Sequence, residues 1–144
     1  MNKNLFRYTE KCLYDYPHNC TRMEMLKINV ALLRLRGDVN VQSYDCVASS
    51  GGFSDPVFAY TVKVDSLEHK IAHLERITVP VKKLITDLEQ RQTRKNLISL
   101  KILELYYFKG VPVEVIMQEI HLSRSVFFER KYTLVKKAMR YFKF

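Results

Sequence analysis

Residues 57 to 88 carry the pattern that most restricts how this chain can fold. Apolar side chains recur there at alternating steps of three and four through five heptads, and only Thr78 is a weak member. A repeat of this kind predicts a long helix whose apolar seam packs along another helix. One heptad position holds Val57, Val64, Ile71, Thr78 and Ile85, and the other holds Tyr60, Leu67, Leu74, Val81 and Leu88.

The flanks of this repeat predict where the helix begins and where it is weakest. Asp55-Pro56 precedes it, a capping residue followed by proline at the first helical position, which favours a helix start. Pro80 lies inside it and predicts a bend or break near residues 77 to 79, because proline removes a backbone hydrogen bond. The nearest partner is the heptad run in residues 21 to 36, so we expect an antiparallel helical hairpin. That run consists of Met23, Leu26, Val30 and Leu33.

The remaining N-terminal segments are shorter and less regular. Residues 3 to 16 have helical spacing, and Tyr16-Pro17-His18-Asn19 predicts a break after them. Gly37-Asp38 is expected to end the next helix, because residues 37 to 54 have no helical period. We expect a loop there, with a short extended piece from Val39 to Tyr44. The third expected helix, over residues 57 to 88, is much longer than its expected partner in residues 21 to 36. Its far end must therefore pack on the helix of residues 3 to 16, on the C-terminal domain or on a second chain.

The C-terminal third predicts a different arrangement of short helices. A polar joint at residues 91 to 96 is followed by a helix that ends near Gly110, which we expect to be a left-handed cap. Pro112 opens a short helix, His121-Leu122 makes a tight turn, and Ser123 caps the last helix. A short helix, a tight turn and a capped basic helix are typical of a helix-turn-helix.

The expected fold is therefore all-α and consists of two parts. Residues 1 to 92 form the helical hairpin and coiled-coil region, with the long third helix kinked near Pro80. Residues 93 to 144 form a helix-turn-helix domain that binds DNA.

The positive charge of the chain is concentrated at one end. The formal net charge is +9, and residues 121 to 144 contain seven bases and one acid, which gives +6 in that segment. A basic excess in one terminal segment suggests a polyanionic partner, nucleic acid before membrane.

The adjacent pair Phe127 and Phe128 indicates which side of the last helix is free. Successive helical positions point about 100° apart, so the two rings cannot both face the core. Phe127 shares an inner stripe with Leu134, Ala138 and Tyr141, and we expect that stripe to be core. Phe128 points toward the exposed start of the helix, where a recognition helix reaches base edges. The alternative is a bundle terminus with solvated bases and with Phe128 buried against another helix.

The residue types at this end suggest particular contacts with duplex DNA. Arg124 could bond guanine in bidentate fashion, Ser125 could bond a base or a phosphate, and Phe128 could touch a thymine methyl group. Glu129 either accepts from a cytosine amino group or pairs with a neighbouring base and orients it, and the second interpretation is favoured. We expect phosphate contacts from Lys131, Lys136, Lys137 and Arg140. The full expected DNA-binding set is Ser123, Arg124, Ser125, Phe128, Glu129, Arg130, Lys131, Tyr132, Lys136, Lys137 and Arg140.

Other classes of function have little support in the sequence. The chain has no Gly-rich phosphate loop, no G-x-S-x-G motif and no evident pair of catalytic carboxylates, so we expect neither an enzyme nor a cofactor. His69 and His73 have the spacing of a metal pair, but they fall outside the seam and no third ligand is evident. Three cysteines without a C-x-x-C pair predict reduced intracellular thiols. The sequence shows neither a signal peptide nor a run of 18 apolar residues, so we expect a soluble protein with no membrane partner.

The order of several segments resembles the regulators of phage late genes in Gram-positive bacteria, the RinA and ArpU type. The marks are LFRYTEKCLYDY, RGDVNVQSYD, GGFSDPV and IHLSRSVFFERKYTLVKKAMRYF, spread over most of the chain. The C-terminal part is also similar to region 4 of bacterial sigma factors, which reads the −35 promoter element. The resemblance implies a transcriptional regulator of phage or prophage origin in the cytoplasm of a bacterial host, with RNA polymerase as a further partner. Family members often carry a basic residue where Glu129 stands, and this chain departs from that pattern.

Two other interpretations of the same pattern remain open. A small terminase subunit also combines a helix-turn-helix with oligomerising helices, and it marks viral DNA for packaging. In that family the DNA-binding part usually comes first, whereas here it comes last, which favours regulation. The third interpretation is an adaptor whose coiled-coil face binds another protein and whose basic tail is incidental. In each case residues 57 to 88 could also join copies of the chain into a homo-oligomer.

Overall fold

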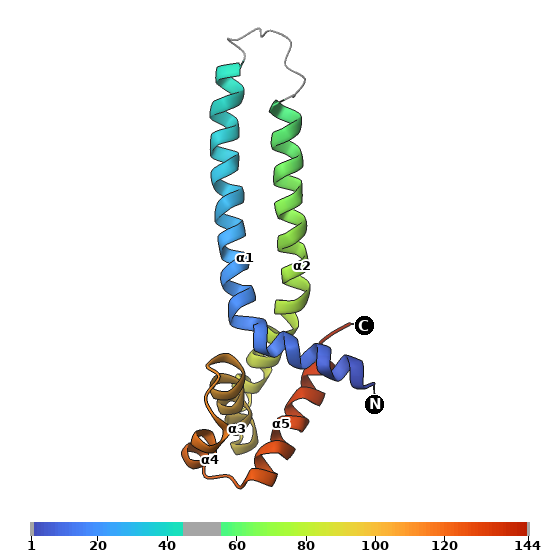
Figure 1. Cartoon of the computed structure of the whole chain (residues 1–144), viewed down its shortest axis with the longest axis vertical. Helices are drawn as coiled ribbons and strands as arrows, with labels where there is room; N and C mark the ends of the chain where they lie inside the picture. Colours follow the sequence, from blue (N-terminus) through green and yellow to red (C-terminus); the bar gives the residue numbers. More distant parts are fainter. Residues whose placement is uncertain (1, 45–55, 144) are drawn as a thin grey trace. The chain divides into compact units, whose positions relative to one another are not determined.

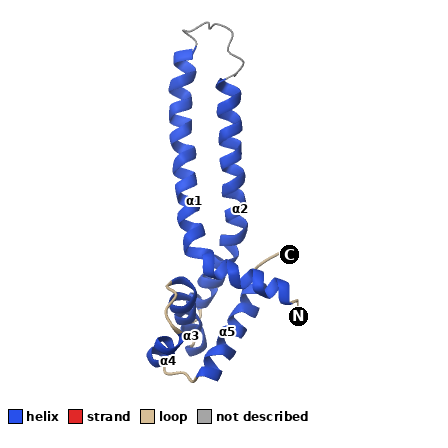
Figure 2. Cartoon of the chain, viewed as in Figure 1, coloured by secondary structure: helices blue, strands red, loops and turns tan. Residues whose placement is uncertain are grey.

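The computed structural model describes residues 2–44 and 56–143, and every regular element in those ranges is helical (Figures 1 and 2). The expected all-α class is confirmed at this level. The elements in chain order are α1 (Lys3–Tyr44), α2 (Pro56–Gln90), α3 (Arg94–Ile102), the π-helical segment η1 (Leu103–Phe108), α4 (Val113–Ile120) and α5 (Arg124–Met139).

The chain divides into two compact units. The core unit consists of Met1–Asn19 and Arg76–Phe144, and the arm unit consists of Cys20–Glu75. Both α1 and α2 therefore contribute one end to each unit. These units do not divide the chain between residues 92 and 93. The boundary expected there separates two functional regions, and it stays a prediction.

The core unit is built around apolar side chains from α1, α2, α3, η1, α4 and α5. Full burial of such a side chain stabilises a fold by about 1.5–3 kcal/mol, so this cluster holds the inner face of α5 in place. Its largest fully buried members are Leu13, Val81, Leu84, Leu88, Ile102, Leu103, Ile116, Phe127, Leu134 and Val135.

Both prolines that were expected to interrupt helices lie inside continuous helices. α1 runs through Pro17, so the expected break at Tyr16–Asn19 is wrong. α2 runs through Pro80, and the bend expected near residues 77 to 79 is not confirmed. An interior proline costs a helix about 3 kcal/mol, and burial of neighbouring side chains can offset that cost. Leu13 beside Pro17 and Val81 beside Pro80 are both fully buried.

The helix end expected at Gly37-Asp38 is also wrong, because α1 continues to Tyr44. Glycine in a helix interior costs only about 1 kcal/mol relative to alanine, so it permits a stop without forcing one. The extended piece expected from Val39 to Tyr44 is helical instead. The rest of the expected loop and the cap Asp55 lie outside the described residues. α2 begins at Pro56, as the position of that proline predicts.

In the arm unit, the α1 and α2 segments run side by side in opposite chain directions (Figure 1). Ion pairs join the two segments: Lys27 Nζ lies 3.9 Å from Glu75 Oε1, and Arg34 pairs with Glu68. Among the residues of this unit whose side chains the structure describes, the buried apolar ones all come from the two predicted heptad runs. They are Val30, Val64 and Leu74.

Later members of the α2 seam belong to the core unit. Thr78, Val81 and Leu88 are buried there, whereas Val57 at the start of the seam is half exposed. The seam is thus largely covered within a single chain. A homo-oligomer through residues 57–88 is therefore not supported by this face.

The connection from α2 to α4 follows the predicted turn chemistry. The joint is shorter than expected, and Thr93 caps α3 by accepting a hydrogen bond from the Asn96 backbone N–H at 3.2 Å. Gly110 has φ 66°, which confirms the predicted left-handed cap. The Val111 N–H donates across this turn to the Leu105 carbonyl at 2.8 Å, which satisfies an end group of η1.

Candidate nucleic-acid interface

The turn between α4 and α5 fixes where α5 begins. α4 ends at Ile120, and its cap His121 has left-handed φ 54° and ψ 46°. The Leu122 N–H donates to the Met117 carbonyl at 3.2 Å. Ser123 then caps α5, its Oγ accepting from the Val126 N–H at 3.4 Å. The turn at His121-Leu122 and the cap at Ser123 are confirmed.

The inner face of α5 is core, as the sequence predicts. Phe127, Leu134, Val135 and Ala138 are all buried. Tyr141 packs against the edge of this cluster, and its hydroxyl donates to Asp87 Oδ2 on α2 at 2.5 Å. The pKa of the Tyr141 hydroxyl is raised, mainly because of this hydrogen bond.

The first turn of α5 is open to solvent. The Arg124 side chain is 66% exposed, Ser125 is exposed, and Phe128 is 38% exposed. The Phe128 ring rests edge-to-face on the Phe127 ring, 5.3 Å between centroids, and the Arg124 guanidinium lies 5.6 Å from the Phe128 centroid. Phe128 therefore sits at the rim of the core with part of its surface free, and burial against another helix does not occur in the described structure.

Arg124 has only a weak internal partner. Its Nη1 lies 3.5 Å from Glu114 Oε1 on α4, and both side chains are about two-thirds exposed. Exposed ion pairs contribute about 0–1 kcal/mol, so a nucleic-acid ligand could displace Glu114 at small cost.

The outer face of α5 presents a row of polar side chains. Helical periodicity places Ser125, Glu129, Lys136 and Arg140 within about 60° of one another, and all four are exposed. The Glu129 carboxylate forms no hydrogen bond or ion pair within residues 2–44 and 56–143. The favoured interpretation, that it orients a neighbouring base, therefore has no support in this geometry. Arg130 lies on the flank of this row and is half-buried.

Lys131 departs most from the expected phosphate contacts. Its side chain is 18% exposed, and its Nζ lies 3.1 Å from Glu10 Oε1 and 3.4 Å from the Tyr106 hydroxyl. The ammonium also lies over the rings of Tyr106 and Phe128, at 4.9 and 5.6 Å from their centroids. Because a carboxylate, a hydroxyl and two rings surround this charge, Lys131 stabilises the core unit and is not available to a phosphate while these contacts persist.

Lys137 and Tyr132 are also engaged within the core unit. Lys137 Nζ lies 3.5 Å from Asp87 Oδ2, the same oxygen that accepts the Tyr141 hydroxyl. The Tyr141 hydrogen bond lowers the pKa of the Asp87 carboxyl most, and Lys137 lowers it further. Tyr132 stacks on Phe6 of α1 at 5.4 Å.

Of the four lysines and arginines expected to contact phosphates, Lys136 and Arg140 are the two that are exposed. Lys136 Nζ lies over the Tyr132 ring, 5.4 Å from its centroid, and both Lys136 and Arg140 are exposed. They stand on the same outer face as Ser125. Lys136 and Arg140 are therefore the main candidates for phosphate contacts on α5.

Sequence reasoning missed the residues that hold Lys131 in place. Glu10 on α1 pairs with Lys131, and the same oxygen accepts the Tyr107 hydroxyl at 2.9 Å. Burial raises the pKa of Tyr107, and the nearby Glu10 carboxylate raises it further. These partners come from separate helices, so no local pattern signals the contact.

The described ranges contain no group of three or more His, Cys, Asp and Glu side chains suited to a metal ion. No helix in those ranges is both long and apolar enough to cross a bilayer. Cys12 and Cys20 are free thiols, and Cys46 lies outside the described residues. Comparisons with protein-family models, curated proteins and solved structures found no match to this chain.

Proposed function

We propose that this chain is a sequence-specific double-stranded DNA-binding regulator of transcription, and that α5 is its recognition helix. In this proposal Arg124, Ser125 and Phe128 contact base edges, while Lys136 and Arg140 contact phosphates. Glu129 lies between the two groups and could accept from a cytosine amino group.

The observation that carries this proposal is the uncovered first turn of α5. A helix whose inner face is fully buried is rigidly held, and its first turn can then offer side chains to a groove in a fixed geometry. Arg124 and Phe128 stay accessible there although Phe127 between them has no exposed surface.

We also infer that the fold consists of a helical hairpin and a helix-turn-helix. α4, the left-handed turn at His121 and the capped helix α5 have the local order of a helix-turn-helix. The arm unit, with antiparallel segments joined by two ion pairs, suits a helical hairpin. The promoter as target, the phage origin and RNA polymerase as partner rest on the resemblance of the sequence segments alone.

Selection from a library of random duplexes tests the proposal. The wild-type chain should enrich duplexes that share a motif, and the Arg124→Ala, Phe128→Ala double variant should retain duplex binding without that motif. Lys136→Ala is the matched control, because it removes a phosphate contact and should leave the motif unchanged. The proposal fails if the wild type enriches no motif, or if the double variant enriches the same one.

A mass measurement in solution separates regulation from DNA packaging. A large ring would support the small-terminase alternative, whereas a monomer or dimer supports a promoter-binding regulator. The result is independent of the DNA selection, because both classes of protein bind duplex DNA.

A further inference from the structure

A small hollow in the arm unit is lined by basic side chains from both helices. Its volume is about 250 Å³, and no acidic side chain lines it. The lining residues are Arg22 on α1 and His69, Lys70, His73 and Leu74 on α2. All of them belong to the same compact unit.

The four nitrogen-bearing side chains of this hollow have no hydrogen bond or ion pair in the part of the chain that the structure describes. Two other bases of the arm unit do have acidic partners, because Lys27 pairs with Glu75 and Arg34 pairs with Glu68. His69 also borders a neighbouring hollow that contains Asp65 and Glu68. Glu68 and Glu75 are therefore each paired with a base that does not line the basic hollow.

We propose that this hollow, which we name the basic hollow, binds a phosphate oxyanion. The Arg22 guanidinium presents parallel N–H donors that match two phosphate oxygens, Lys70 adds a point charge, and each imidazole can donate one N–H. The fixed charges of Arg22 and Lys70 disfavour a metal cation between the histidines. The anion is either a free phosphate compound or a phosphate of a nucleic-acid backbone, and the chemistry of recognition is the same.

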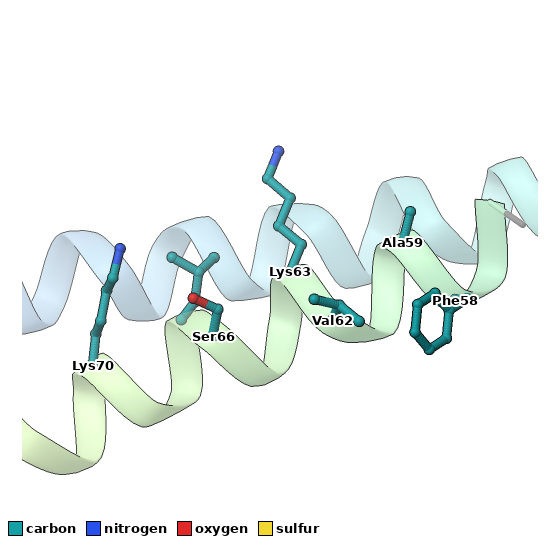
Figure 3. Close-up of a pocket in the computed structure, with 7 residues that line it drawn as sticks. Phe58, Ala59, Val62, Lys63, Ser66 and Lys70 are labelled. Carbon is teal, nitrogen blue, oxygen red and sulfur yellow. The ribbon is translucent and has the colours of Figure 1, made fainter. Parts of the chain in front are cut away.

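Lys63 provides a matched control for this site. Figure 3 shows Lys63 and Lys70 extending from the same flank of α2, where both line a larger apolar hollow with Phe58 and Val62. Only Lys70 also lines the basic hollow. Lys63→Gln therefore removes the same charge from the same flank without touching the proposed site.

Nuclear magnetic resonance of the full chain tests the proposal. The imidazole signals of His69 and His73 are followed while inorganic phosphate is added at constant ionic strength, with chloride as the reference anion. A second titration uses a duplex oligonucleotide of random sequence. Both are repeated with Arg22→Gln, with Lys70→Gln and with Lys63→Gln.

We expect saturable shifts of both histidines, with apparent affinity about fivefold to tenfold weaker in Arg22→Gln and Lys70→Gln and nearly unchanged in Lys63→Gln. Shifts with inorganic phosphate assign a free phosphate compound, and shifts with duplex alone assign a backbone phosphate. The proposal is overturned if neither titrant shifts the histidines, or if all three variants weaken the response equally. The function proposed for α5 is independent of this result, because its selected motif is read without the arm unit's histidines.

Discussion

Replacement of Lys131 by methionine should destabilise the core unit strongly, although the sequence places this lysine among the DNA-contacting bases. Methionine keeps most of the apolar length of the side chain and removes the charge. The change leaves the Glu10 carboxylate without its ion pair at a position where both side chains are about four-fifths covered. It also removes the cation from the rings of Tyr106 and Phe128.

The size of the effect follows from the burial of this pair. Removal of one partner from a fully buried ion pair costs about 3–5 kcal/mol. Here solvent still reaches 18% of Lys131 and 21% of Glu10, and Glu10 keeps its hydrogen bond from Tyr107. We therefore expect a loss of about 2 kcal/mol in the free energy of unfolding for Lys131→Met. Lys136→Met, on the exposed face of the same helix, should cost about 0.5 kcal/mol or less.

Urea unfolding followed by circular dichroism measures both losses. The Glu10→Gln, Lys131→Met double variant should lose about 1 kcal/mol less than the sum of the two single variants, because the interaction is lost only once. Equal stability of Lys131→Met and Lys136→Met would refute the assignment of Lys131 to the core.

Three other perturbations give distinct outcomes. The Lys136→Ala, Arg140→Ala double variant should reduce the slope of log affinity for duplex against log salt concentration by up to about two. Lys131→Met should leave that slope unchanged. An unaltered slope in the double variant would show that Lys136 and Arg140 do not contact phosphates. Phe127→Ala should cost about 3–5 kcal/mol of unfolding free energy and Phe128→Ala about 1 kcal/mol, and similar losses would contradict their different burial. The lowered pKa of Asp87 means that its stabilising contribution is present above the ordinary carboxyl pKa of about 3.9 and is lost as pH falls through the folded value. The urea midpoint of wild type should thus fall more steeply between pH 5 and about pH 2 than that of Asp87→Asn, and parallel curves would reject this linkage.

Local chemistry made much of the fold predictable from the sequence. Pro56, Gly110 and Ser123 act through backbone geometry and capping, and the structure confirms all three. The heptad pattern likewise identified side chains that are buried, because burial on one side of a helix leaves a periodic trace. Phe127 as the core member of its pair follows from the same periodicity.

Helix ends were less predictable because a residue that disfavours a helix does not by itself end one. Pro17, Gly37 and Pro80 each suggest an interruption, yet α1 and α2 pass through them. Each costs a helix about 1–3 kcal/mol, which is comparable to the burial of one or two apolar side chains. A sequence pattern alone does not show which of these terms is larger.

The candidate site was predictable in its exposed part and not in its internal pairing. Periodicity separated the outward side chains Ser125 and Lys136 from the inner face of α5. It could not show that Lys131 forms an ion pair with Glu10 on α1, or that Lys137 forms one with Asp87 on α2. Those contacts depend on how helices distant in the sequence pack together.

Mapping of the backbone amide signals of the chain during titration with a duplex of about 20 base pairs tests the role of α5 most directly. We predict the largest changes at the first turn and outer face of α5, at Arg124, Ser125, Glu129, Lys136 and Arg140, with the salt dependence of a phosphate contact. Changes confined to other helices, with the α5 signals unmoved at saturation, would contradict the assignment of α5 as the helix that binds DNA.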